Sequence, residues 1–130
     1  MQHFQRHTSE DSSYLQVLNK KDLPFKVERI FFVNSSSNRS CTRGGHAHRD
    51  CEQLLVCLSG QITINLLNSK GESTVTLEEG QEYYHPKMEW ADITFNESNS
   101  ILLSLCSLEY LEKDYIRDKE EFLSILKTEN

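Results

Sequence analysis

The chain has 130 residues, which suits one domain, 1–130, with a single core. Hydrophobic residues make up 37% of it, no run approaches the roughly 20 apolar residues of a membrane-spanning helix, and no signal-peptide stretch opens the sequence. The net charge of −6 argues against a general nucleic-acid-binding surface, so we expect a cytoplasmic protein that binds neither membrane nor nucleic acid.

Strand patterns occupy most of the chain. Residues 1–13 carry no such pattern and are expected to be irregular. Residues 25–33 form the first run of β-forming residues, and a polar loop over 34–40 follows it. Further strands are expected at 53–58, 61–66, 73–77, 91–95 and 101–106. The run at 53–58 is apolar almost throughout, which indicates burial on both faces.

The connections and the tail complete the pattern. The segment Asn68-Ser69-Lys70-Gly71, between two alternating strands, is typical of a hairpin turn. Only the tail changes period, because apolar residues form one stripe among charged residues over about 114–127 and predict a C-terminal helix. Many short strands followed by one helix favour an all-β fold, an antiparallel sandwich or barrel.

Two histidines, His46 and His48, are the strongest candidates for chemistry. In an extended backbone, side chains at i and i+2 point to the same face, so both imidazoles face one place while Ala47 faces away. Imidazole binds transition metals in its neutral form and exchanges protons near neutral pH. The pair therefore suits a metal site or a proton-transfer site, and a pair of hydrogen-bonded surface histidines is the structural alternative.

The two histidines lie in a locally basic segment. From Lys26 to Arg49 the sequence has five basic residues and one acidic residue, whereas the rest of the chain has nine basic and nineteen acidic residues. Such a segment can attract an anionic small molecule, such as a phosphate-bearing metabolite. Ordinary solvated surface charge is the alternative interpretation.

The sequence argues against a resident metal. The four cysteines include no C-x-x-C pair, so reduced thiols are expected rather than a disulfide framework or a thiolate zinc site.

The order of His-x-His, Glu52 and a later Gly-x5-Pro run resembles the two motifs of the cupins, small β-barrels of the jelly-roll kind. Metal-binding cupins add a histidine from the second motif, and Ala91 stands at that position here. A metal-dependent cupin with His85 as a substitute ligand is kept as an alternative.

Four segments carry a closer resemblance. They are Leu23–Phe31, Arg43–His48 with Glu52-Gln53, Pro86–Trp90 and Tyr110–Asp118. The first resembles a P-F-x-[IV]-[KE]-R-[VI]-F strand, the second an R-G-x-H-A-H…Q motif and the last a Y-x-x-x-D-Y-I-R ending. Over roughly residues 23–123, the chain is similar to one metal-free cupin family, the dTDP-4-keto-6-deoxyglucose 3,4-ketoisomerases of nucleotide-sugar biosynthesis.

This resemblance implies a cupin jelly-roll barrel, a homodimer, and an isomerase of deoxysugar biosynthesis such as that of O-antigen or lipopolysaccharide. The expected substrate is a dTDP- or UDP-linked 4-keto-6-deoxyhexose, whose carbonyl moves between adjacent carbons through an enediol without cofactor or metal. By position, His46 is the expected carbon base and His48 its proton partner. The expected substrate-binding residues are Arg29, Arg43, Gln53, Tyr83, His85 and Trp90, of which the arginines suit the diphosphate. For Trp90, a core aromatic is the alternative.

The chain departs from the family pattern in two places. Phe32 stands where the family usually has a tyrosine that is thought to assist proton transfer, and Asp11–Leu15 lacks the arginine and glycine of the family's N-terminal segment. The candidates for a replacement proton donor are Tyr83, Tyr84 and His85. A non-catalytic cupin that binds nucleotide sugars is the second hypothesis, because Phe32 and Ala91 remove functional groups from the expected pocket.

Overall fold

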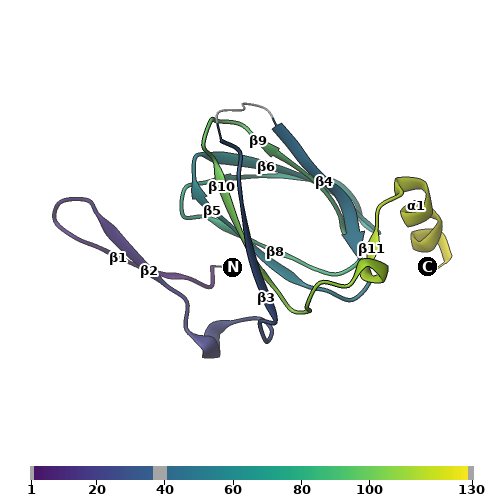
Figure 1. Ribbon diagram of the computed structural model, residues 1–130, viewed down its shortest axis with the longest axis horizontal. Helices are drawn as coiled ribbons and strands as arrows, with labels where there is room; N and C mark the ends of the chain where they lie inside the picture. The colour runs from purple at the N-terminus through teal and green to yellow at the C-terminus, as the bar shows by residue number, and fades with distance from the viewer. Residues whose placement is uncertain (1, 37–40, 129–130) are drawn as a thin grey trace.

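The computed structural model describes residues 2–36 and 41–128, without the side chains of residues 41–44. Most of this part of the chain forms short strands (Figure 1). In chain order the elements are β1 (Gln5–Thr8), β2 (Tyr14–Val17), the 3-10 turn η1 (Lys20–Asp22), β3 (Arg29–Asn34), β4 (Cys41–His48), β5 (Gln53–Ser59), β6 (Gln61–Asn68), β7 (Gly71–Glu78), β8 (Glu82–His85), β9 (Trp90–Phe95), β10 (Ile101–Cys106), the 3-10 turn η2 (Glu112–Asp114), β11 (Tyr115–Ile116) and α1 (Lys119–Thr128).

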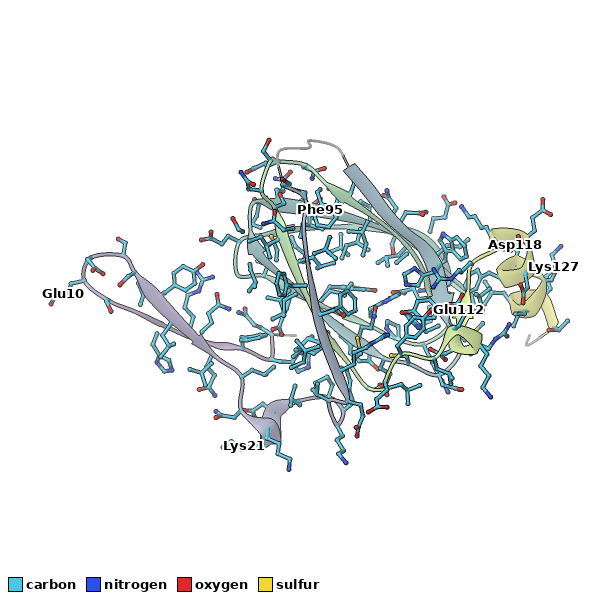
Figure 2. The ribbon with its side chains drawn as sticks, viewed as in Figure 1. Glu10, Lys21, Phe95, Glu112, Asp118 and Lys127 are labelled. Carbon is cyan, nitrogen blue, oxygen red and sulfur yellow. The ribbon has the colours of Figure 1, made fainter. Side chains whose placement is uncertain are left out.

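Two antiparallel sheets enclose the core. One sheet has the strand order β3-β10-β5-β8, and the other has the order β11-β4-β9-β6-β7. The main buried apolar cluster, which includes Leu55, Ile64 and Phe95, takes residues from both sheets, and Figure 2 shows Phe95 between them. The arrangement confirms the predicted all-β fold class with a C-terminal helix, and its two facing sheets fit the expected jelly-roll architecture.

The clearest sequence patterns form the predicted strands. Along β6, Ile62, Ile64 and Leu66 are buried and alternate with more exposed residues. Asn68 pairs with Gly71 across the β6–β7 turn, which confirms the predicted hairpin. Residues 53–57 of β5 are buried on both faces, because the inner face meets the barrel core and the outer face is covered by N-terminal apolar residues.

The N-terminal part is more ordered than its sequence predicts. Residues 5–8, expected to be irregular, form β1 and pair with β2 in a hairpin that extends away from the barrel in Figure 1. All of β1 is exposed, so it carries no buried face and leaves no periodic signal in the sequence. The strand expected from residue 25 begins only at Arg29, where its pairing with β10 starts.

The C-terminal helix is shorter than predicted. Tyr115 and Ile116 form β11 instead of a first helical turn, because they pair with His48 and Ala47 of β4. Helix α1 begins at Lys119, where the Asp118 carboxylate accepts hydrogen bonds from the backbone N–H groups of Glu120 and Glu121. In the described chain, no helix has the length and apolar content to cross a bilayer.

Candidate active site

The histidine motif lies on the last part of β4, next to a β-bulge. The pairing of β4 with β9 shifts register between Gly44 and His46, and Gly45 has a φ of +68°. This left-handed conformation favours glycine, which has no Cβ to clash. After the bulge, β4 continues in the extended form, with His46 opposite Ala91 and His48 opposite Tyr115.

His46 and His48 face the same side of β4, as the alternation predicts. Their ring centroids are 4.9 Å apart and their planes are nearly perpendicular. Tyr115 is packed against both rings, with centroid distances of 5.1 Å to His46 and 4.4 Å to His48. Ala47 is completely buried on the opposite face, beneath α1. The predicted imidazole pair is therefore confirmed, with a phenol ring added to it.

A cavity of about 140 Å³ opens beside this group, between the two sheets. Its polar lining consists of His46, Gln53, His85 and Tyr115. The rest of the lining is apolar and includes Phe31, Ala91 and Phe95. A largely apolar cavity with a few convergent polar groups is the usual form of a small-molecule site.

His48 stands behind the cavity lining and is held by a carboxylate. Its Nδ1 lies 2.8 Å from Oδ2 of Asp114, and both side chains are buried. Burial lowers the pKa of His48 below its usual 6.5, and the bond to Asp114 opposes that effect. The ring is then neutral at neutral pH and donates its Nδ1 proton to the carboxylate. The other nitrogen, Nε2, is buried and has no hydrogen-bond partner among the described residues.

His85 and Gln53 form a second polar pair at the cavity. They face each other on β8 and β5, with 3.2 Å between Nδ1 of His85 and Oε1 of Gln53. The other ring nitrogen, Nε2, lies 2.8 Å from the backbone oxygen of Glu89. Burial lowers the pKa of His85, which keeps a neutral polar ring in the cavity wall.

Arg29 approaches the site from β3. Its Nη2 donates a hydrogen bond of 3.3 Å to the hydroxyl oxygen of Tyr115. Burial alone would lower the pKa of Arg29, but hydrogen bonds to Tyr115 and Cys106 raise it, so the guanidinium is charged. Arg29 was expected to bind a diphosphate, whereas the structure gives it a partner beside the histidines.

Cys106 lies next to Arg29 at the end of β10. Its sulfur is 3.5 Å from Nε2 of Gln53 and 3.4 Å from the hydroxyl of Ser104. The hydrogen bond from Cys51 and these neighbouring donors lower the pKa of Cys106. The three cysteines with described side chains, Cys51, Cys57 and Cys106, are free thiols.

Two of the predicted substrate-binding residues lie away from the cavity lining. Trp90 packs against Phe122 of α1, with 5.7 Å between ring centroids, on the outer side of the barrel. This packing agrees with the alternative interpretation of Trp90 as a core aromatic, and its role as a substrate ligand stays a prediction. Tyr83 packs against the main core and donates a hydrogen bond of 2.6 Å to Glu89. Burial raises the pKa of Tyr83 strongly, which makes it a poor proton donor.

Phe32 and Arg43, two residues that the sequence analysis singles out, do not contribute described side chains to the cavity. Phe32 points outward from β3 and is 70% exposed, while its neighbour Phe31 lines the cavity. Phe32 therefore removes no functional group from the pocket, in contrast to Ala91, which does line it. Arg43 lies opposite Ile93 in the β4–β9 pairing, and its side chain is outside the described part of the structure.

The carboxylate of the cupin-like motif does not join the histidines. Glu52 accepts a hydrogen bond from Tyr84 on the outer side of β5, so Tyr84, a candidate replacement proton donor, does not line the cavity. Burial together with this contact raises the pKa of Tyr84 to about 12. Among the described residues, one group has the donor atoms to hold a metal ion, namely His48, Cys51 and Asp114, with donor atoms within 4.8 Å of one another. This group differs from the ligand set that the motif predicts.

Tyr115 and Asp114 also lie at the site, although the sequence periodicity does not predict them there. Both belong to the Asp-Tyr-Ile-Arg segment, whose apolar stripe predicts the start of the C-terminal helix. The resemblance of that segment to the Y-x-x-x-D-Y-I-R ending is the signal that points to them. Pairing of β11 with β4 brings both residues to the histidines across more than sixty positions of sequence.

Comparison with known proteins gives one family. The family model FdtA, described as "WxcM-like, C-terminal", matches residues 1–127. The chain is 28% identical over 121 residues to the TDP-4-oxo-6-deoxy-alpha-D-glucose-3,4-oxoisomerase of Aneurinibacillus thermoaerophilus, a match that covers 92% of this chain and 86% of the relative.

Solved structures agree with this comparison. QdtA, a sugar 3,4-ketoisomerase from Thermoanaerobacterium thermosaccharolyticum solved in complex with TDP, superposes with a TM-score of 0.88 at 26% identity, over 98% of this chain and 93% of that one. WlaRA, a TDP-fucose-3,4-ketoisomerase from Campylobacter jejuni, gives a TM-score of 0.82 at 29% identity, over 95% and 91% of the two chains.

Proposed function

Because the chain belongs to the FdtA family and is an isomerase, we propose that it is a 3,4-ketoisomerase of a TDP-linked 4-keto-6-deoxyhexose. The carbonyl and the neighbouring hydroxyl of the hexose exchange positions through an enediol. The reaction needs a base for the proton next to the carbonyl and a donor that returns a proton to the adjacent carbon. The imidazole pair His46 and His48 is the observation that carries this proposal.

His46 is the proposed carbon base, because it lines the cavity where the hexose would bind. His48 is its proton partner, because its ring is 4.9 Å away and its Nε2 has no partner among the described residues. Asp114 holds His48 through Nδ1 and thereby selects the tautomer whose Nε2 accepts a proton. A buried carboxylate also stabilises the imidazolium that forms when His48 takes a proton.

The size of the cavity suggests which part of the substrate binds inside it. Its volume of about 140 Å³ is below the roughly 300–1,000 Å³ of sites that enclose a whole drug-sized ligand. We assign it to the hexose and place the nucleotide outside it. Gln53 and His85, which line the cavity, are the proposed contacts of the sugar hydroxyls. Arg43, in the basic segment, is the proposed contact of the diphosphate.

We also propose that the protein is a cytoplasmic homodimer. Ile30 and Phe32 are 63% and 70% exposed on the outer face of β3, an edge strand. Two large neighbouring apolar side chains on a sheet edge are the kind of surface that a second copy covers. The free thiols of Cys51, Cys57 and Cys106 suit a reducing compartment.

The proposed function is tested by incubating the protein with TDP-4-keto-6-deoxyglucose in deuterated water and following the sugar by NMR. A new keto sugar with deuterium at the exchanged carbon is expected. His46→Asn should lower the rate by about 10²- to 10⁴-fold, the range of general acid–base catalysis. TDP binding without turnover would support the non-catalytic hypothesis and contradict the proposal.

A further inference from the structure

The proposed reaction requires an acid for oxygen as well as a base for carbon. When the proton next to the carbonyl leaves, negative charge develops on the carbonyl oxygen. His46 and His48 account for the carbon protons, and the oxygen still needs a donor. The sequence offers phenols for this role, and the structure distinguishes among them.

The chain has five tyrosines, and all lie in the described part of the structure. Four of them donate their hydroxyl proton to a carboxylate. These pairs are Tyr14 with Glu79, Tyr83 with Glu89, Tyr84 with Glu52, and Tyr110 with Glu112. A hydroxyl that is hydrogen-bonded to a carboxylate is not available to protonate a substrate.

Tyr115 differs because its hydroxyl accepts a hydrogen bond from a cation instead of donating one to a carboxylate. Its oxygen accepts a hydrogen bond from Nη2 of Arg29, so its own proton can point elsewhere. Tyr115 is also the tyrosine that lines the cavity, in contact with the ring of His46. A guanidinium bonded to the phenol oxygen stabilises the phenolate that remains after proton donation.

The surroundings hold this arrangement in place. Arg117 lies over the Tyr115 ring at 4.3 Å from its centroid, and Glu112 binds Arg117 through a hydrogen bond of 2.7 Å. On the other side of the phenol, Arg29 has the sulfur of Cys106 as a second hydrogen-bond partner. The phenol is therefore fixed between two cations, Arg117 at its ring and Arg29 at its hydroxyl oxygen.

We propose that Tyr115 is the catalytic acid of the isomerisation and that Arg29 is its positioning residue. The assignment rests on the proposed ketoisomerase function. In the first half, His46 takes the proton from the carbon beside the carbonyl while Tyr115 gives its hydroxyl proton to the carbonyl oxygen, which produces the enediol. In the second half, the Tyr115 phenolate takes the proton of the other enediol hydroxyl while the imidazolium protonates the former carbonyl carbon. No proton or electron is gained or lost overall.

The experiment compares Tyr115→Phe with the wild-type protein and with Tyr84→Phe as the matched control. Tyr115→Phe keeps the ring packing, so TDP binding by calorimetry and KM should stay within about threefold of wild type, while kcat falls about 100-fold or more. Tyr84→Phe removes a hydroxyl from the outer face of the barrel and should retain wild-type kcat. Fluorinated tyrosine at position 115, with a more acidic phenol, should move the alkaline limb of the kcat profile to lower pH.

The outcomes separate this inference from the function on which it rests. Wild-type protein without turnover would contradict the ketoisomerase function and the role of Tyr115 together. Wild-type turnover with a Tyr115→Phe kcat within threefold of it would refute the catalytic acid alone. A fluorotyrosine profile that does not shift would show that the ring only packs against the histidines, and would also overturn the assignment.

Discussion

The Nδ1 atom of His48 lies 2.8 Å from Oδ2 of Asp114, and the two residues are 66 positions apart in the sequence. The second carboxylate oxygen, Oδ1, accepts a hydrogen bond of 2.7 Å from the backbone N–H of Asp50. Asp114 therefore orients the ring of His48 and also holds the loop that follows β4. The orientation of His48 therefore depends on η2, the 3-10 turn that contains Asp114.

Replacement of Asp114 by Asn should lower kcat by about 10²- to 10⁴-fold, because an amide presents a donor as well as an acceptor to Nδ1 and permits the wrong tautomer. Steady-state kinetics with the TDP-linked keto sugar measures this loss, and TDP binding should be unchanged. Asp11→Asn, which changes a carboxylate in the exposed β1–β2 loop, is the control and should keep full activity. Full activity of Asp114→Asn would mean that the His48–Asp114 bond does not direct proton transfer.

Acid should destabilise the protein through its buried histidines. Burial lowers the pKa values of His48 and His85 below 6.5, so between the folded and unfolded pKa values the unfolded chain binds more protons. The neutral rings contribute their full stabilisation above pH 6.5, the pKa of histidine in the unfolded chain. This contribution is lost as the pH falls through the lower pKa values of the folded protein. The melting temperature, followed by circular dichroism from about pH 7.5 to about pH 5, should therefore decrease. His85→Gln should show a shallower decrease, and a wild-type melting temperature that stays constant over this range would contradict the expectation.

The sequence predicts the strands that bury one or both faces. Ile62, Ile64 and Leu66 alternate because one side of β6 faces the core, so the period is visible in the residues themselves. The same argument places His46 and His48 on one face of β4, since the two-residue period holds once the bulge at Gly45 has passed. Local periodicity therefore recovers the barrel wall and the imidazole pair.

Residues whose role depends on distant pairing are not predictable in this way. Tyr115 belongs to an apolar stripe with helical spacing, and only its pairing with His48 converts it to a strand residue at the site. The face of Trp90 depends on where α1 packs, which the strand pattern around it does not reveal. The β1–β2 hairpin escapes prediction because neither face of β1 is buried.

Trp90 should matter for stability and not for substrate recognition. Because it packs between Ala47 and Phe122 under α1, Trp90→Ala should lower the free energy of unfolding by about 3–5 kcal/mol in urea or thermal denaturation. Trp90→Phe retains most of the packing and should leave KM for the keto sugar unchanged. A tenfold rise of KM in Trp90→Phe, without loss of stability, would restore Trp90 as a substrate ligand.

Gly60, between β5 and β6, should tolerate no side chain. Its φ is +78°, and a Cβ there would lie 2.2 Å from Oγ and 2.9 Å from Cα of Ser100. Gly60→Ala should therefore cost left-handed backbone strain and an overpacking penalty of about 1–3 kcal/mol. Gly71→Ala separates the backbone strain from the overpacking, because Gly71 also has a positive φ but a Cβ there meets nothing within 4 Å. In denaturant unfolding, the free energy of unfolding of Gly60→Ala should be well below that of Gly71→Ala. Equal values for the two variants would contradict the predicted clash.

The exposed face of β3 gives the last prediction, which concerns the oligomeric state. Phe32 is 70% exposed beside Ile30, and a charge placed in an apolar interface between two copies loses hydration without gaining a partner. Phe32→Glu should therefore convert the proposed dimer to a monomer in size-exclusion chromatography with light scattering. Leu123→Glu, on the exposed side of α1, is the matched control and should leave the dimer intact. A wild-type protein that is monomeric at all concentrations would refute the dimer, and a Phe32→Glu variant that stays dimeric would place the interface elsewhere.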